Sequence, residues 1–148
     1  MASIVDSMTN DHRRCDAIFA EAESFVSDSE WEKGAAGFLE FRQAMEHHFT
    51  MEEEVLFPAL EECNIQAAGP TQVMRMEHKQ MRQLLSEMAQ AVEQRDRDRY
   101  LGLAETLMII MQQHNMKEEQ MLYRMADQAL GMDVPQILRK MEAVEPVE

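Results

Sequence analysis

Residues 45–58 read MEHHFTMEEEVLFP, and residues 111–124, which lie 66 positions later, read MQQHNMKEEQMLYR. Each stretch contains a histidine followed four residues later by a glutamate, so both side chains lie on one face of a helix. The two pairs are His48 with Glu52 and His114 with Glu118. This spacing predicts a two-point chelate in each half of the chain.

The same offset of 66 residues relates further positions. His12 is repeated as His78, and two methionine pairs, Met8 with Met74 and Met45 with Met111, follow the same rule. The sequence therefore predicts two copies of one helical hairpin, at about 4–65 and 70–130, packed about a pseudo-twofold axis. His47 falls outside the repeated set, because Gln113 occupies the corresponding position.

Apolar residues at helical spacing predict four long helices and a short fifth. We expect an all-α fold, an antiparallel up-down-up-down four-helix bundle with a short C-terminal helix, as a single domain over residues 1–148. The expected helices cover about 4–27, 30–56, 70–95, 99–130 and a short segment from 133.

Several residues are expected to set the helix ends. Asp28 or Ser29 can cap the second helix, and Pro58 is expected to break or kink it because its ring removes a backbone hydrogen bond. Residues 64–69 are expected to form a loop, and Gly131 to stop the fourth helix. We expect residues 142–148 to fray.

The four repeated histidines are expected to lie at one level of the bundle. At ~1.5 Å per residue, the first helix climbs roughly 23 Å from His12, and the second descends roughly 27 Å to His48. The same calculation holds for His78 and His114, so all four imidazoles can share one layer.

Four inward imidazoles and two carboxylates predict a metal site, since buried charged groups need compensating partners. A single inward histidine is more often an ordinary core residue, but six such groups at one level favour ligands. Two ions, each bound by two imidazoles and sharing two bridging glutamates, fit this set, and iron, manganese or zinc suits it better than magnesium or calcium. The predicted ligands are His12, His48, Glu52, His78, His114 and Glu118.

Other residues near the predicted ligands are expected to have ordinary structural or surface roles. The four repeated methionines are expected to be flexible core filler, with sealing of the site from water as an alternative. Cys15 is expected to be a small buried residue rather than a reactive thiol. Tyr123, which replaces Phe57 of the first copy, is expected to be an ordinary surface tyrosine rather than a redox or hydrogen-bond partner. Solvated charge is expected at Glu53, Glu54 and Glu119.

The composition excludes some partners. With 28 acidic and 14 basic residues among 148, the formal net charge is −14, which argues against nucleic acid and anionic membranes as partners. No apolar run is long enough for a membrane span. Residues 1–10 lack the features of a signal peptide, and two cysteines fit a reduced cytoplasm. We expect a cytoplasmic monomer or homodimer.

Taken together, these motifs resemble the hemerythrin-like, or HHE cation-binding, family. The matching elements are DHRRCDAIF, HFTMEEEVLFPAL, EHKQMRQLL and HNMKEEQMLY, within about residues 11–126. The resemblance implies a bundle around an oxo- or hydroxo-bridged non-haem di-iron centre, with zinc or manganese as less favoured ions. By motif position, the four histidines would be terminal ligands, and Glu52 and Glu118 would bridge the irons.

The chain departs from the oxygen-carrying branch of that family, which has a fifth histidine four residues from another on the third helix. Here Met74 and Arg82 occupy the positions four residues from His78, and the last acid follows its histidine by four residues instead of five. The pattern is closer to members associated with iron sensing, iron-centre repair and nitric oxide responses. We expect a protein that binds or senses O2, NO or peroxide rather than an enzyme. The alternatives are a di-iron enzyme that removes peroxide or NO, iron storage or delivery, and a structural zinc or empty layer.

Overall fold

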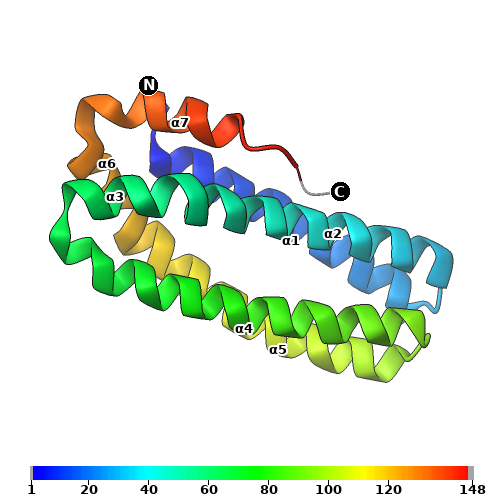
Figure 1. Ribbon diagram of the computed structural model, residues 1–148. Helices are drawn as coiled ribbons and strands as arrows, with labels where there is room; N and C mark the ends of the chain where they lie inside the picture. The colour runs from blue at the N-terminus through cyan, green and yellow to red at the C-terminus, as the bar shows by residue number, and fades with distance from the viewer. Residues whose placement is uncertain (1, 147–148) are drawn as a thin grey trace.

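The computed structural model describes residues 2–146 and is an all-α bundle of four long helical rods with a short C-terminal helix (Figure 1), which confirms the predicted fold. Two of the rods are helices interrupted by a π-helical turn, η1 or η3. The elements are α1 Ile4–Ser27; α2 Trp31–Met51, η1 Glu52–Leu56 and α3 Phe57–Cys63; α4 Ala68–Glu93; α5 Arg97–Lys117, η3 Glu118–Leu122 and α6 Tyr123–Leu130; and α7 Val134–Glu142. No helix among the described residues has the length and apolar character needed to cross a bilayer.

The start of α1 is held by two side chains. The Ser3 hydroxyl accepts a hydrogen bond from the backbone N–H of Asp6, as an N-cap residue should. The carboxylate of Asp127, on α6, accepts the backbone N–H groups of Ile4 at 2.7 Å and Val5 at 3.1 Å. The second hairpin therefore caps the first helix of the first hairpin.

The turns at the tips of the two hairpins have the same backbone conformation. Ser29 and Arg95, which are 66 positions apart, both have positive φ, at 57° and 53°. The expected cap at Asp28 or Ser29 is wrong, because Asp28 instead ends α1 and α2 begins at Trp31 without a side-chain cap. The repeat extends to these turns as well as to the histidines.

Pro58 does not end the second rod, so the break predicted as one outcome at this residue is absent. The rod continues through η1 and α3 to Cys63, with Pro58 in the first turn of α3, where a missing N–H is tolerated. The π-turn does not depend on proline, because Arg124 occupies the corresponding place after η3. In each turn a backbone N–H, of Phe57 or Tyr123, donates to the carbonyl five residues earlier.

The ends of the other helices differ from expectation by a few residues. The expected loop at 64–69 is mostly helical, since a 3₁₀ turn (η2, Ile65–Ala67) leads directly into α4. Gly131, with φ of 47°, ends α6 as predicted. Helix α7 ends at Glu142; of the segment expected to fray, residues 147–148 lie outside the described residues.

The core forms two apolar clusters, one on each side of the histidine layer. The cluster toward the hairpin tips contains the aromatic pair Phe19 and Phe41, whose ring centroids are 5.0 Å apart. The other cluster is completed by α7, through Ile137, Leu138 and Met141. The polar layer is thus enclosed by apolar packing above and below.

Candidate metal centre

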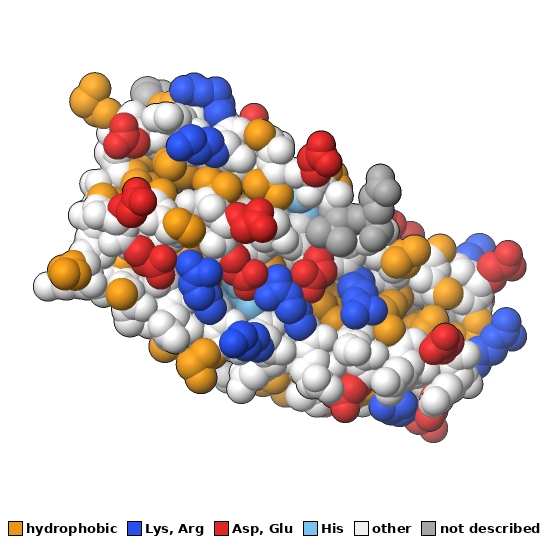
Figure 2. Space-filling view, in the orientation of Figure 1, with side chains coloured by type: hydrophobic (Ala, Val, Ile, Leu, Met, Phe, Trp, Pro, Cys, Tyr) orange, Lys and Arg blue, Asp and Glu red, His pale blue; other side chains and the backbone are white. Residues whose placement is uncertain are grey.

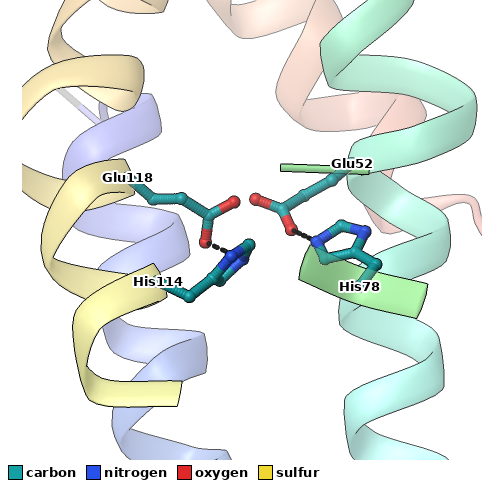
Figure 3. Close-up of side chains that lie close together, drawn as sticks. All are labelled: Glu52, His78, His114 and Glu118. Atoms are coloured by element: carbon teal, nitrogen blue, oxygen red, sulfur yellow. Dashed lines mark hydrogen bonds and ion pairs between the residues drawn. The ribbon is translucent and has the colours of Figure 1, made fainter. Parts of the chain in front are cut away.

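Six polar side chains converge inside the bundle, and all are at most 4% exposed. One histidine comes from each long rod, while Glu52 and Glu118 are the first residues of the two π-turns. Figure 3 shows both carboxylates pointing toward each other, with His114 beside Glu118 and His78 beside Glu52. The six are His12, His48, Glu52, His78, His114 and Glu118. The sequence analysis predicted this set, and the structure brings all its members together.

Each buried glutamate connects the two hairpins. Oε1 of Glu52 lies 3.1 Å from Nε2 of His78 and 3.4 Å from Nε2 of His48. Oε1 of Glu118 lies 3.0 Å from Nε2 of His12. The same oxygen lies 3.2 Å from Nε2 of His114. Either carboxylate can therefore share its oxygens between ions held by different pairs of histidines.

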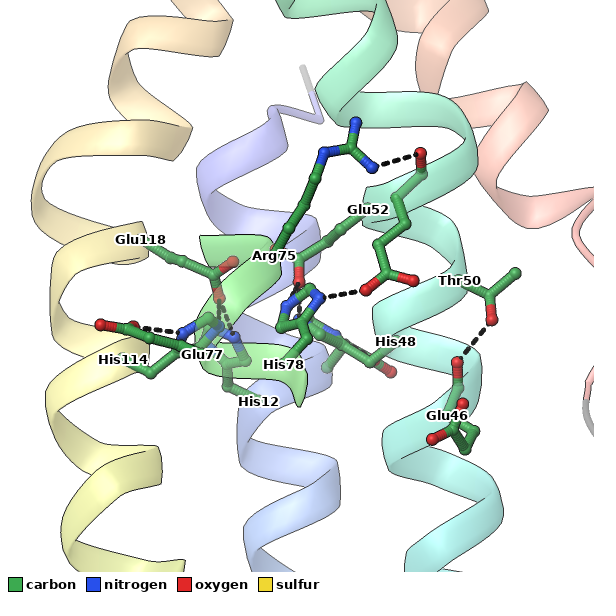
Figure 4. Close-up of polar contacts among 12 residues, drawn as sticks. His12, Glu46, His48, Thr50, Glu52, Arg75, Glu77, His78, His114 and Glu118 are labelled. Carbon is green, nitrogen blue, oxygen red and sulfur yellow. Dashed lines mark hydrogen bonds and ion pairs between the residues drawn. The ribbon is translucent and has the colours of Figure 1, made fainter. Parts of the chain in front are cut away.

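A second set of acids holds the outer nitrogen of each ring. The Nδ1 atoms lie 2.7 to 2.8 Å from carboxylate oxygens, and Figure 4 shows the example of Glu77 beside His114. The four pairs are Asp11 with His48, Glu53 with His78, Glu77 with His114, and Glu119 with His12. A ring that donates through Nδ1 presents the lone pair of Nε2 to the layer, as in carboxylate–histidine–metal sites.

This second set corrects the expectation that Glu53 and Glu119 are merely solvated charges. The two acids are related by the 66-residue offset, as are Asp11 and Glu77, so the outer set repeats with the ligands. Only Glu54 is exposed as expected. The sequence does contain a pattern that could have revealed this second set. Each of the four acids directly neighbours a predicted ligand, and the arrangement repeats after 66 residues.

Basic side chains lie behind three of the four outer acids. Arg82 contacts both oxygens of Glu53, at 2.8 and 3.0 Å. Burial opposes ionisation of Glu53, but hydrogen bonds from His78 and Arg82 lower its pKa to about 2. Arg14 supports Asp11 and Lys117 supports Glu77 in the same way. These cations keep the outer acids ionised.

Tyr123 is fully buried at the layer, so its expected surface position is wrong. Its hydroxyl oxygen lies 2.8 Å from Oε2 of Glu52 and 2.9 Å from Oε1 of Glu118, so its single proton can be donated to either carboxylate. It also lies 3.1 Å from Nε2 of His12 and 3.3 Å from Nε2 of His48. Burial and the charge of Glu118 raise the pKa of this phenol well above its ordinary value.

A family model described as the hemerythrin HHE cation-binding domain matches residues 3–126 of the chain. The chain belongs to this family. No curated protein matches it, and no solved structure does. The matched region contains all six converging side chains, so cation binding by this HHE domain rests on both the family and the buried cluster.

The donor atoms of the HHE domain fit two metal ions. They form two groups within which the donor atoms lie no more than 4.8 Å apart, and Glu118 belongs to both: Glu52, His78, His114 and Glu118; and His12, His48 and Glu118. Oε2 of Glu118 is buried without a hydrogen-bond partner, and Nε2 of His114 faces Oε1 of Glu118 at 3.2 Å without hydrogen-bond geometry, although buried polar groups ordinarily form a hydrogen bond. An ion would satisfy both atoms.

The electrostatics of the layer also favour cations. Burial and the facing charge of Glu118 raise the pKa of Glu52. Burial disfavours the charged form of His114, but the Glu118 carboxylate outweighs it and raises the pKa of His114 to about 9. Protons therefore supply the positive charge that the two central carboxylates require when no metal is bound.

The remaining candidates lie outside the donor groups. Nε2 of His47 lies 3.0 Å from the carbonyl oxygen of Val144, at the C-terminal side of α7. Cys15 is buried, as expected, and burial raises the pKa of its thiol to about 12. Neither residue has the geometry of a ligand.

Proposed function

We propose that this HHE domain holds two iron ions and binds a small ligand, O2, NO or peroxide, at them. The observation that carries the proposal is the pair of buried donor groups joined by Glu52 and Glu118. Nitrogen and carboxylate donors without thiolate suit iron, with zinc and manganese as weaker candidates. When bound, iron supplies open coordination positions and one-electron chemistry.

The protein residues have separate roles in this proposal. The four histidines and two glutamates hold the ions, and the outer acids fix the ring orientations. The hydroxyl of Tyr123 lies within hydrogen-bonding distance of both bridging carboxylates and can donate its proton to either. The apolar clusters on either side keep bulk water from the layer.

Metal analysis of purified protein tests the proposal directly. We expect two irons per chain and a near-ultraviolet band from an oxo or hydroxo bridge that disappears on reduction. We expect His78→Ala to lower the iron content and His47→Ala to leave it unchanged, because His47 lies outside the donor groups. Less than one metal ion per chain, or equal loss in the two variants, would contradict the proposal.

Experiments on the iron-loaded protein can distinguish ligand binding, enzymatic turnover and iron storage or delivery. A reversible spectral change when O2 or NO is added to the reduced form indicates ligand binding. Sustained consumption of peroxide or NO indicates an enzyme instead. Rapid loss of iron to a weak chelator indicates storage or delivery.

A further inference from the structure

An apolar groove lies between α4 and the rod formed by α5 and η3, with a volume of about 260 Å³. Its rim includes Val73 and Met121, which are 45% and 54% exposed, whereas Met74 and Leu122 are nearly buried. The lining residues are Pro70, Val73, Met74, Lys117, Met121 and Leu122. Met74 precedes His78 by one helical turn, and Leu122 directly precedes Tyr123. The groove therefore lies directly outside the metal layer.

The corresponding surface of the first hairpin is partly covered by α7. Subtracting 66 from the groove positions leads to four buried residues, Ile4, Met8, Met51 and Leu56. The counterparts of the rim residues Val73 and Met121 are Ser7, which is exposed, and Val55, which is half-buried. Helix α7 packs against α1 and η1. Its residues Ile137, Leu138 and Met141 share one apolar cluster with these four residues and also with Met74 and Leu122. Helix α7 thus covers part of this surface in the first hairpin, and no described helix covers the groove of the second. Figure 1 shows α7 over the α1–α3 side of the bundle, away from α4 and α5.

The two candidate metal positions also differ in how many protein groups surround them, and the position on the side of the groove has fewer. The hydroxyl of Tyr123 lies within 3.3 Å of donor atoms of both His12 and His48. On the other side Phe57, the counterpart of Tyr123, presents only an aromatic ring, stacked with His78 at a centroid distance of 5.9 Å. Two buried atoms without a hydrogen bond come from the rod that borders the groove. They are Oε2 of Glu118 and Nε2 of His114, and the latter has an ion-pair contact of 3.2 Å with Oε1 of Glu118. The position held by His78 and His114 therefore has no fifth protein donor among the described residues.

We propose that this groove admits a small neutral diatomic molecule, O2 or NO, and delivers it past Met74 to the metal position held by His78 and His114. This inference rests on the proposed function and adds the entry route, the ligand class and the receiving ion. An apolar lining favours a neutral diatomic over a hydrated anion. A methionine side chain has three rotatable bonds, so it can move aside for a small molecule. The His12 and His48 position is flanked by Tyr123 and partly covered by α7.

Xenon tests the groove in the metal-free protein, because it enters apolar cavities that stay dry. We expect xenon pressure to shift the methyl NMR signals of Met74 and Met121. The signal of Met8, the counterpart of Met74 beneath α7, is the internal control and should not move. The absence of shifts at Met74 and Met121, or equal shifts at Met8, would overturn the groove as an entry site.

Stopped-flow NO binding to the reduced, iron-loaded protein tests delivery. Val73→Trp at the exposed rim should slow binding by about tenfold, and Met74→Ala should speed it by a similar factor. Met8→Ala removes the same atoms at the equivalent covered position and should leave the rate unchanged. Iron content is measured for each variant, so that loss of metal is not mistaken for blocked access.

The outcomes distinguish the two proposals. Rapid NO binding that is unaffected by Val73→Trp, or altered equally by Met8→Ala and Met74→Ala, would overturn the route and leave the proposed function standing. A loaded wild-type protein that binds no NO, O2 or peroxide would overturn the proposed function and delivery together. The xenon result would then still decide whether the groove admits small apolar molecules.

Discussion

At the residue scale, the four outer acids determine how the histidine rings face the layer. Asp11, Glu53 and Glu77 each contact an arginine or lysine side chain as well as a histidine. Glu119 contacts Nδ1 of His12 but forms no ion pair with a lysine or arginine in the described part of the chain. The charge behind the ligands is therefore unequal, although the ligands themselves repeat.

Replacing an outer acid is predicted to weaken metal binding without removing a ligand. Glu53→Gln keeps an acceptor near Nδ1 of His78 but loses the charge, and we expect metal affinity to fall roughly 10- to 100-fold. Competition with a coloured chelator measures the change. Glu54→Gln, at an exposed neighbouring position, is the control, and equal losses in both variants would show that Glu53 has no specific role.

Removing the hydroxyl group from each of the two buried tyrosines is predicted to change the unfolding free energy differently. Tyr123→Phe removes the single hydroxyl donor that two buried carboxylates share, and it should lower the unfolding free energy of metal-free protein by about 1–3 kcal/mol. The hydroxyl of Tyr100 is buried without a partner, so Tyr100→Phe should be neutral or stabilising. Urea unfolding measures both variants, and similar losses would rule out a special contribution from the Tyr123 hydrogen bonds.

The six central donors could be predicted because they repeat in sequence and helical spacing places them at one level. Tyr123 could not, because in a regular helix the residue five positions after Glu118 lies on a different face. The π-turn changes that register and brings the hydroxyl of Tyr123 to the carboxylate of Glu118. Glu53 and Glu119 were missed for a related reason, since they contact histidines on other helices.

At the scale of elements, the two π-turns place the two central glutamates, Glu52 and Glu118, and π-bulges occur often at functional sites. Each turn leaves a carbonyl that accepts from an arginine: Glu53 from Arg75 at 3.3 Å, and Glu119 from Arg124 at 3.4 Å. The arginine comes from a neighbouring helix in one case and from the same rod in the other. No single sequence signal marks the turn, so the sequence predicted only a break or kink at Pro58.

Helices α1 and α2 pack closely through glycine, and this predicts a contrast between two substitutions. A Cβ atom at Gly37 would lie 3.3 Å from the Cα of Ala22, whereas one at Gly102 on α5 would meet nothing within 4 Å. Gly102→Ala should stabilise the protein by roughly 0.5–1 kcal/mol through helix propensity. Gly37→Ala should lose that gain because the backbones must separate. Denaturant midpoints compare the two, and equal stabilisation would contradict the close packing.

At the scale of the whole molecule, ionisation of the layer predicts how stability varies with pH. The pKa of His114 is raised from 6.5 to about 9, so its contribution to metal-free stability is present below pH 6.5 and lost as pH rises through 9. The pKa values of Asp11 and Glu53 are lowered to about 2, so their contributions are lost as pH falls toward 2.

Urea unfolding across this pH range tests the prediction. Metal-free protein should lose stability between pH 6.5 and 9. Metal-loaded protein should not, because a histidine bound to metal through Nε2 no longer takes up a proton there. A flat profile for the metal-free protein over that interval would show that His114 is not coupled to Glu118 as the geometry indicates.

The 66-residue repeat also bears on how such a centre could have arisen. Two copies of one hairpin, related by a twofold axis, would by themselves provide the four histidines and two glutamates of the layer. Gene duplication and fusion add something that a symmetric dimer cannot have, since in a dimer every substitution occurs twice. Tyr123 opposite Phe57, Arg124 opposite Pro58 and a single α7 each occur on one side only. In a fused chain, substitutions can therefore change the surroundings of one candidate ion position and leave those of the other unchanged.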